Sequence, residues 1–349
     1  MADIHIRIEG RAGRITLTRP KALNALSYEM CLAIDAALKD WAQDDAVALV
    51  LIDAAGDKAF CAGGDIAQMY STGKSGDYSY GRQFWSDEYG MNARLAEYSK
   101  PIVSFLQGFV MGGGVGVGCH ASHRIVGETS QISMPECGIG LVPDVGGSWI
   151  LSRAPGALGA YLGLTGARVG PGDAIRAGFA DLFIPQDHWN SLKAQLVATG
   201  DTGALQGSPA PEAALAAHRE SIDAAFGQDS LPAIAQALEQ DDSAFATKAL
   251  QSLLRNSPLS MACTLAMLRN LDAQCSIRDA LAQEYRFTWR AMEHADFLEG
   301  IRAAIIDKDR APRWRHAHLA DLTQAEASAM LAALGADELT FETLEETQK

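Results

Sequence analysis

The 349-residue sequence predicts an α/β protein, with strands and helices alternating in the first half and helices dominating the second half. Two apolar runs, at 46–52 and 102–106, are continuous, as in strands that are covered on both faces. Glycine-rich turns follow both runs, whereas helical stretches dominate from about residue 188 to 306. These observations predict a core of repeated strand, strand and helix over residues 1–200, completed by a helical C-terminal region over 201–349.

The N-terminal elements follow from residue periodicity. Residues 4–8 and 14–17 alternate apolar and polar side chains, which is typical of half-buried strands. Apolar residues then recur every four positions from 26 to 38, which predicts an amphipathic helix capped by Ser27. Two shorter strand signals occur further along the chain, at 124–126 and 131–133.

Glycine and proline mark the remaining boundaries. We expect a helix to follow the glycines at 112–118, because a glycine run commonly opens a helix in α/β proteins. Residues 200–211 are rich in Gly, Ser, Thr and Pro, and this is the most linker-like segment. The acidic tail after Thr340 is expected to be a solvated helix end or disordered.

Composition excludes several classes of function. The chain is 48% hydrophobic and 21% charged, as expected for a packed globule, and its formal net charge of −14 disfavours nucleic acid as a partner. The N-terminus lacks the pattern of a signal peptide. No apolar run approaches the roughly 18 residues that a membrane-spanning helix needs, so no such helix is expected. Six scattered cysteines without a C-x-x-C pair are typical of reduced thiols. We therefore expect a cytoplasmic protein that does not bind membranes.

Several motifs fail on inspection. The Gly73-Lys74-Ser75 sequence resembles the end of a phosphate-binding loop, but Gln68 stands where that loop needs its first glycine. The glycines at 112–118 fit no register of a dinucleotide fingerprint. Neither His120 nor His123 has an evident third metal ligand, so no metal site is expected.

Two glycine-rich turns, at 60–65 and 108–114, are candidates for binding a developing oxyanion. Backbone without a Cβ atom lets a ligand oxygen approach the N–H groups closely, and one N–H from each turn would form an oxyanion hole. Close packing between strands and helices would require glycine equally well, so the residues alone leave both interpretations open.

The segment 134–147 places Glu136 and Asp144 in an otherwise apolar loop rich in Gly and Pro. Burial of a carboxyl group raises its pKa toward the range of a working acid or base. The alternative is that both residues merely cap loop backbone, and the pattern alone does not exclude it.

These three segments together resemble the crotonase (enoyl-CoA hydratase/isomerase) superfamily. The Met-Pro-Glu and Pro-Asp-Val-Gly-Gly sequences within 134–147 narrow the resemblance to its 3-hydroxyisobutyryl-CoA hydrolase branch. Further segments match that branch: the Arg-Pro-Lys and Asn-Ala-Leu sequences near the N-terminus, 84–89, and 296–314. The resemblance covers about residues 4–315 and implies a crotonase-like spiral of repeated ββα units with a helical C-terminal region.

The resemblance also implies a reaction, the hydrolysis of a short 3-hydroxyacyl-CoA thioester of valine catabolism. The thioester oxygen would lie between the backbone N–H groups of Gly64 and Gly113. Glu136 would activate water, or attack the thioester carbon to form a transient anhydride, and the sequence does not separate these routes. Asp144 would hold the substrate hydroxyl and assist proton transfer, and Glu88 would line the same pocket.

Binding of CoA is expected along the first two motifs. Lys21 and Lys58 are candidates for the phosphate groups, although either could be a solvated surface lysine. The resemblance adds four nearby contacts, namely Ala25, Ala62, Asp65 and Ile66. No metal or redox cofactor is expected, because water, a carboxylate and two N–H donors suffice and CoA is part of the substrate. Members of this superfamily commonly form oligomers, so a homo-oligomer is possible.

Two rival functions remain. One is an enoyl-CoA hydratase or isomerase reaction, which is disfavoured because Gly116 occupies the position of the second catalytic glutamate of hydratases. The other is a non-catalytic acyl-CoA-binding scaffold, against which the presence of both Glu136 and Asp144 argues.

Overall fold

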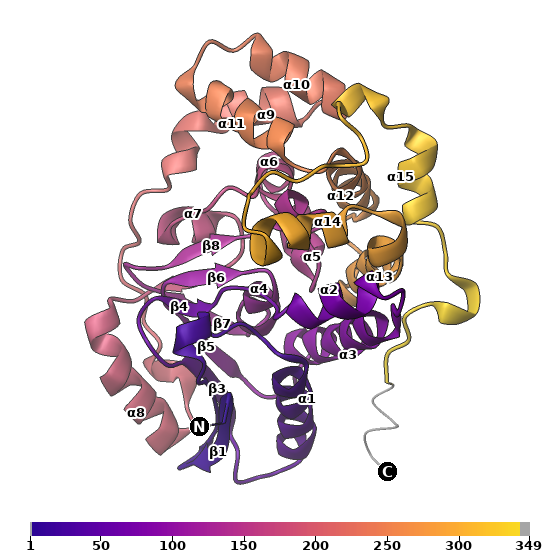
Figure 1. Cartoon of the computed structure of the whole chain (residues 1–349). Coiled ribbons are helices and arrows are strands. Elements are labelled where there is room, and N and C mark those ends of the chain that lie inside the picture. Colours follow the sequence, from indigo (N-terminus) through magenta and orange to yellow (C-terminus); the bar gives the residue numbers. More distant parts are fainter. Residues whose placement is uncertain (1, 343–349) are drawn as a thin grey trace.

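The computed structural model describes residues 2–342, and two β-sheets organise the first half of this chain (Figure 1). The larger sheet has six strands in the order β1-β2-β3-β5-β7-β9, and the smaller has three in the order β4-β6-β8. Their bounds are Ile4–Glu9 (β1), Ala12–Leu17 (β2), Leu49–Ala54 (β3), Ala59–Cys61 (β4), Ile102–Leu106 (β5), Phe109–Met111 (β6), His123–Val126 (β7), Gln131–Ser133 (β8) and Leu182–Phe183 (β9).

From β3 onward, successive strands alternate between the two sheets. Strands β3, β5 and β7 are parallel neighbours in the large sheet, and the strand that follows each of them, β4, β6 or β8, lies in the small sheet. Each strand pair therefore advances both sheets by one position before the chain returns through helical or irregular segments. This arrangement is a spiral of repeated ββα units, as the sequence predicts.

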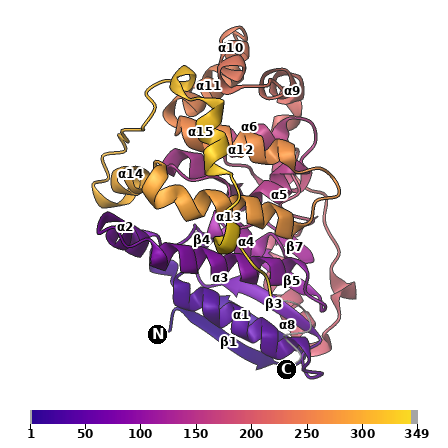
Figure 2. The same cartoon turned by 90° about the vertical axis from the view of Figure 1, so that its right-hand side faces the viewer.

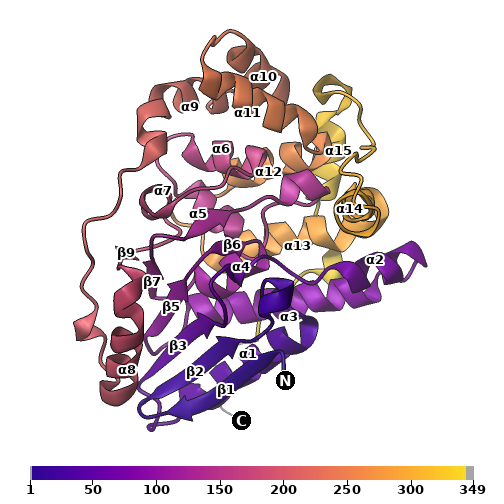
Figure 3. The same ribbon diagram turned by 60° about the vertical axis from the view of Figure 1, so that its left-hand side comes forward.

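The large sheet is covered on both faces, which explains its continuous apolar strands. In β3, Val50 and Ile52 belong to the main hydrophobic core, whereas Leu49 and Leu51 belong to a second cluster on the opposite face. Helix α8 (Trp189–Thr199) covers that second face, where Trp189 packs against Phe105 (Figure 3). Strand β3 begins at Leu49 rather than at residue 46, because the preceding residues form a turn in which the Val47 amide donates to the Asp44 carbonyl.

Helices surround the two sheets and form the whole upper part of the molecule in Figures 1 and 2. Ser27 caps α1 as predicted, since its side chain accepts from the Met30 amide. The remaining helices are α2 (Ala67–Lys74), α3 (Ser79–Ala96), α4 (Gly113–Gly118), α5 (Gly147–Ser152), α6 (Leu158–Thr165), α7 (Pro171–Arg176), α9 (Arg219–Phe226), α10 (Leu231–Glu239), α11 (Ala244–Arg255), α12 (Pro258–Asn270), α13 (Ile277–His294), α14 (Phe297–Ile301) and α15 (Gln324–Met330), with α1 at Tyr28–Ala42. Shorter helical turns are η1 (Pro20–Ala22), η2 (Glu136–Ile139), η3 (Gln186–His188), η4 (Thr202–Ala204), η5 (Ala214–His218), η6 (Arg302–Ile306, a π-helix), η7 (Leu319–Asp321) and η8 (Gly335–Asp337).

The glycine run at 112–118 differs from its prediction, because these glycines form a helix, α4, instead of preceding one. The reason is close packing on one side of this short helix. A Cβ atom on Gly114 would lie 2.1 Å from the Cys61 carbonyl oxygen, and one on Gly118 would lie 2.5 Å from the Leu106 side chain. Glycine thus allows α4 to approach both sheets more closely than any other residue could.

The C-terminal helices share their core with the ββα spiral. The main hydrophobic cluster extends from Ile15 to Leu339, and α13 packs along α3 (Figure 2). The predicted boundary at residue 200 stays a prediction, and most of the acidic tail, residues 343–349, lies outside the described residues. Among residues 2–342, no helix has the length and apolar character that crossing a membrane requires.

Candidate active site

Three sequence-distant segments meet because they follow the three parallel strands of the small sheet. The turn at 62–65 follows β4, Gly112 and Gly113 follow β6, and the loop that begins at Met134 follows β8. Parallel strands end at the same edge of a sheet, so the segments that follow them converge. The first two segments are here called the glycine wall, and residues 134–148 the acid wall.

The glycine wall brings two backbone amides close together. Gly64 forms a parallel bridge with Leu26. In this bridge the Leu26 amide donates to the Gly63 carbonyl and the Asp65 amide donates to the Leu26 carbonyl, so the Gly64 amide takes no part in it. Gly113 is the first residue of α4, so the helix itself provides no acceptor for its N–H group. A Cβ atom on Gly113 would lie 3.3 Å from the Gly64 nitrogen. The two predicted oxyanion-hole residues are therefore adjacent.

Glu136 faces this glycine wall from the first position of η2. Glu136 is only 4% exposed, and its Oε2 atom is buried without a hydrogen-bond partner among the described residues. A Cβ atom on Gly112 would lie 2.7 Å from the Glu136 Oε1 atom. Glycine at 112 therefore makes room for the carboxyl group, and an unpartnered buried carboxyl is unusual outside functional sites.

Asp144 and Glu88 complete a buried group of acids around Glu136. The hydroxyl of Tyr89 donates to the Asp144 Oδ2 atom at 2.8 Å, and Tyr89 is the neighbour of Glu88 on α3. A Cβ atom on Gly113 would lie 3.3 Å from the Glu88 Oε1 atom, so Glu88 borders the glycine wall. The structure thus brings Gly64, Gly113, Glu88, Glu136 and Asp144 together, while their individual roles stay predictions.

Burial sets the protonation of these acids. It raises the pKa of Glu136 well above the ordinary value, and the nearby Asp144 charge adds to this effect. Burial also raises the pKa of Asp144, to about 7, although the hydrogen bond from Tyr89 opposes this rise. The pKa of Glu88 is likewise raised by burial and by the Asp144 charge. At neutral pH the group therefore retains protons that solvated carboxyl groups would have lost.

Gly116 shows why a second glutamate is absent from α4. A Cβ atom at this position would lie 2.8 Å from the Asn92 side-chain nitrogen and 2.8 Å from the Val145 Cβ atom. Val145, the residue that follows Asp144, fills the space beside α4. A longer side chain at 116 would displace Val145, so the second acid of this site is provided by the loop at Asp144.

Elements of the C-terminal region hold the acid wall in place. The Ser257 amide donates to the Cys137 carbonyl at 2.9 Å, and the Ser257 hydroxyl donates to Asp296 at 2.6 Å. Further along, Glu284 of α13 accepts from the Gly146 amide at 2.8 Å. The acid wall is therefore fixed by residues more than 100 positions away in the sequence.

Tyr89 and Glu284 were not predicted as site residues from the sequence. Tyr89 lies inside the 84–89 segment that carries the family resemblance, but no spacing rule links it to Asp144. Glu284 interrupts the apolar face of α13, where Leu281 and Thr288 are also fully buried. An acid on the apolar side of an amphipathic helix was therefore an available signal.

Most of the residues expected to bind CoA lie beside the glycine wall, whereas Lys58 precedes β4, at the other end of that strand. The Ala62 amide donates to the Leu23 carbonyl, so the segment with Lys21 and Ala25 runs beside the turn with Ala62, Asp65 and Ile66. Asp65 forms an ion pair with Arg19 at 3.0 Å. Lys21 and Lys58 are exposed, and neither forms an ion pair within residues 2–342. Contact with CoA stays a prediction for all six.

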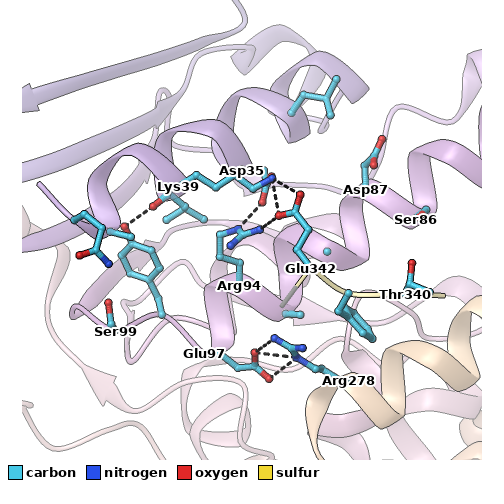
Figure 4. Close-up of a pocket in the computed structure, with 18 residues that line it drawn as sticks. Asp35, Lys39, Ser86, Asp87, Arg94, Glu97, Ser99, Arg278, Thr340 and Glu342 are labelled. Carbon is cyan, nitrogen blue, oxygen red and sulfur yellow. Dashed lines mark hydrogen bonds and ion pairs between the residues drawn. The ribbon is translucent and has the colours of Figure 1, made fainter. Parts of the chain in front are cut away.

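A well-formed surface pocket lies elsewhere. Its volume is about 460 Å³, and it lies between α1, α3 and residues 340–342 (Figure 4). Glu342 forms ion pairs there with Lys39 and Arg94. None of the predicted site residues lines this pocket, and the side chain of Glu88 lies on a different face of α3.

Comparisons with known proteins agree with this architecture. Residues 12–331 match the family model described as enoyl-CoA hydratase/isomerase. The chain is 37% identical to a protein of Gallus gallus named 3-hydroxyisobutyryl-CoA hydrolase, mitochondrial, over 97% of this chain and 91% of that protein.

Two solved structures are also closely similar. A crystal structure of an enoyl-CoA hydratase from Rhodobacter sphaeroides 2.4.1 is 57% identical, with a TM-score of 0.95 over 97% of this chain and all of that one. A carnitinyl-CoA dehydratase from Mycobacterium thermoresistibile is 40% identical, with a TM-score of 0.94 over 98% and 99% of the two chains. These similarities confirm the predicted crotonase fold, and the chain belongs to the enoyl-CoA hydratase/isomerase family.

Proposed function

We propose that the protein hydrolyses the thioester of a short 3-hydroxyacyl-CoA, with 3-hydroxyisobutyryl-CoA as the expected substrate and 3-hydroxyisobutyrate and CoA as products. The observation that supports this proposal is the pairing of Glu136 and Asp144 on the acid wall, opposite the backbone amides of Gly64 and Gly113, while Val145 fills the space beside Gly116. The relative from Gallus gallus bears the name of this hydrolase and aligns over nearly the whole chain.

The glycine wall would polarise the thioester. With the carbonyl oxygen between the amides of Gly64 and Gly113, negative charge that develops on this oxygen would be stabilised by two fixed N–H donors. Loss of one such donor typically reduces the rate about 10²–10³-fold. Because the donors are backbone atoms, their effect depends on turn geometry and not on side-chain chemistry.

Glu136 would supply the base or the nucleophile. In one route its carboxylate removes a proton from water while the water oxygen attacks the thioester carbon, and the C–S bond breaks to release CoA. In the other route the carboxylate attacks that carbon itself, CoA leaves, and water hydrolyses the resulting anhydride. Both routes need the ionised form of Glu136, whose pKa is raised by burial.

Asp144 would bind the substrate hydroxyl and transfer a proton to the leaving sulfur. Its pKa of about 7 allows it to exist in both protonation states near neutral pH, as a residue that accepts and returns a proton requires. Glu88 would border the acyl group, since it lies next to Gly113. Lys21 and Lys58 would hold the CoA phosphates. Location in the cytoplasm and assembly into a homo-oligomer stay predictions, and the named relative is mitochondrial.

The decisive experiment measures release of CoA from 3-hydroxyisobutyryl-CoA with a thiol reagent. We expect turnover by the native protein and a loss of about 10²–10⁴-fold in kcat for Glu136→Gln, because the amide cannot act as a base. Glu212→Gln, at an exposed position, is the matched control and should keep full activity. Near-normal turnover by Glu136→Gln would overturn the proposed mechanism, and absence of thioester hydrolysis by the native protein would overturn the function.

A hydratase reaction is the second candidate, because the 57% identical structure is described as an enoyl-CoA hydratase. Crotonyl-CoA distinguishes the two reactions. Hydration removes the enoyl absorbance without releasing a thiol, whereas hydrolysis releases the thiol. Tight binding of acyl-CoA esters without either change would instead indicate a non-catalytic scaffold.

A further inference from the structure

Glu284 of α13 makes a set of contacts with the acid wall that the proposed reaction does not use directly. It is fully buried, and its Oε2 atom accepts from the Gly146 amide at 2.8 Å. Its Oε1 atom accepts from the Ser148 amide at 3.0 Å and from the Ser148 hydroxyl. Both carboxylate oxygens are therefore occupied by the backbone turn that follows Asp144.

His120 holds the same turn from another side. Its Nε2 atom lies 2.7 Å from the Val145 carbonyl oxygen, and because a carbonyl only accepts, Nε2 carries the proton and donates. Burial lowers the pKa of His120 to about 4, so the imidazole is neutral at physiological pH. His120 therefore donates to the Val145 carbonyl, and Glu284 accepts from the amide of Gly146, the next residue. These two hydrogen bonds hold Val145 on both sides.

Val145 has a backbone conformation that needs such support. Its φ angle is 53°, in the left-handed region that β-branched residues rarely adopt. The residue is 1% exposed, and its Cβ atom occupies the space beside Gly116. A strained conformation of this kind persists only where surrounding contacts enforce it.

We propose that Glu284 is a positioning residue of the active site: through Gly146 and Ser148 it holds Val145 left-handed and so directs the Asp144 carboxylate toward Tyr89. The chain reverses within this turn, since the Gly147 amide donates to the Asp144 carbonyl at 2.7 Å. Release of Val145 to the ordinary φ region would rotate the peptide between Asp144 and Val145. This inference rests on the proposed function, in which Asp144 acts on the substrate.

The contacts favour a carboxylate at 284 over another polar side chain of that length. Burial raises the pKa of Glu284 to about 8, and the hydrogen bonds from Ser148 and Gly146 oppose this rise because they stabilise the ionised form. Glu284 accepts on both oxygens, from donors on either side of it. Glutamine has a single acceptor oxygen, so its NH₂ group would face one of the two backbone N–H donors and leave this donor unpaired. Glu284→Gln therefore loosens the turn while it preserves side-chain volume.

The test compares kcat and KM for thioester hydrolysis. We expect Glu284→Gln to lower kcat about 10- to 100-fold with KM within about 3-fold of the native value, because small displacements of a reacting group affect the chemical step most. Glu293→Gln, at an exposed position of the same helix, is the matched control and should change neither. Unchanged kcat in Glu284→Gln, with native turnover intact, would overturn this inference and leave the proposed function standing.

A double-mutant cycle separates positioning from general support of the fold. Glycine adopts left-handed φ angles freely, so in a Val145→Gly background the turn depends less on the hydrogen bonds from Gly146 and Ser148 to Glu284. In that background Glu284→Gln should reduce kcat by a factor at least about 3-fold smaller than in the native background. Equal losses in both backgrounds would contradict the inference. If Glu284→Gln does not fold, Ser148→Ala serves instead, because it removes one of the three donors to Glu284. We expect this variant to lower kcat about 2- to 5-fold at unchanged KM, and an unchanged kcat would contradict the inference.

Discussion

The glycine wall and the acid wall face each other across the candidate site, yet they are built differently. The glycine wall consists of backbone amides at the ends of β4 and β6, and strand pairing and the start of α4 orient these amides. The acid wall consists of side chains on an irregular loop, held by α3, α12 and α13. The first wall is main chain ordered by strand pairing within one sheet, whereas the second consists of side chains held by contacts with separate helices.

This difference predicts different sensitivities. The glycine wall should fail when a Cβ atom is added at Gly112, because the φ angle there is positive and the added atom would meet the Glu136 carboxyl group. The acid wall should fail when a hydrogen bond or a charge is removed, because its carboxyl groups are buried and their pKa values depend on neighbours. The following predictions test this contrast.

The largest of these effects is expected for Gly112→Ala. Gly112 has a φ angle of 49°, and the added Cβ atom would lie 2.7 Å from the Glu136 carboxyl oxygen. Displacement of Glu136 should lower kcat about 10²-fold. Gly90→Ala, on α3, is the control. The added Cβ atom would meet nothing within 4 Å, so this variant should keep its activity. Equal kcat for the two variants would show that the walls are not in contact.

A smaller effect is expected for Tyr89→Phe on the acid wall. Loss of the phenol hydroxyl removes the hydrogen bond that opposes the upward shift of the Asp144 pKa, so this pKa rises above about 7. Because Asp144 must be protonated to donate to the leaving sulfur, we expect the alkaline limb of the pH–rate profile to move to higher pH. Loss of the hydrogen bond that holds Asp144 should also lower kcat about 10-fold at pH 7.

Tyr285→Phe is the matched control, because the Tyr285 hydroxyl donates to the Arg82 carbonyl at 3.4 Å and is not the hydroxyl that donates to Asp144. Its profile should coincide with that of the native protein. An unmoved alkaline limb in Tyr89→Phe would mean that Asp144 does not set this limb.

The smallest effect concerns stability. The folded pKa of Glu136 is raised by burial, so above its unfolded pKa the folded state binds more protons than the unfolded state, and stability falls as pH rises. Glu136→Gln removes this penalty. The variant should exceed the native protein in free energy of unfolding by about 1–3 kcal/mol at pH 8, and by less at pH 5.

Urea unfolding at the two pH values measures this difference. Gly90→Ala adds no titratable group, and its Cβ atom would meet nothing within 4 Å, so its stability relative to the native protein should show no such dependence on pH. A Glu136→Gln advantage that is absent at pH 8 would mean that burial of this acid does not destabilise the fold.

Much of the architecture was predictable from local patterns. The continuous apolar runs at 46–52 and 102–106 correspond to β3 and β5, and Ser27 caps α1 as expected. The helix formed by the glycines of α4 was not predicted, because glycine disfavours a helix. Only close packing against Cys61 and Leu106 makes glycine necessary there.

The sequence by itself determined which chemical groups are present: two glycine turns after apolar strands, and Glu136 and Asp144 in an apolar loop. Only the tertiary structure decided how the acids are held, since Tyr89 reaches Asp144 across 55 positions and Glu284 reaches Gly146 across 138. Periodicity and motif spacing describe neighbours along the chain. Contacts over such separations arise when α3 and α13 pack against one loop, and no local pattern encodes that packing.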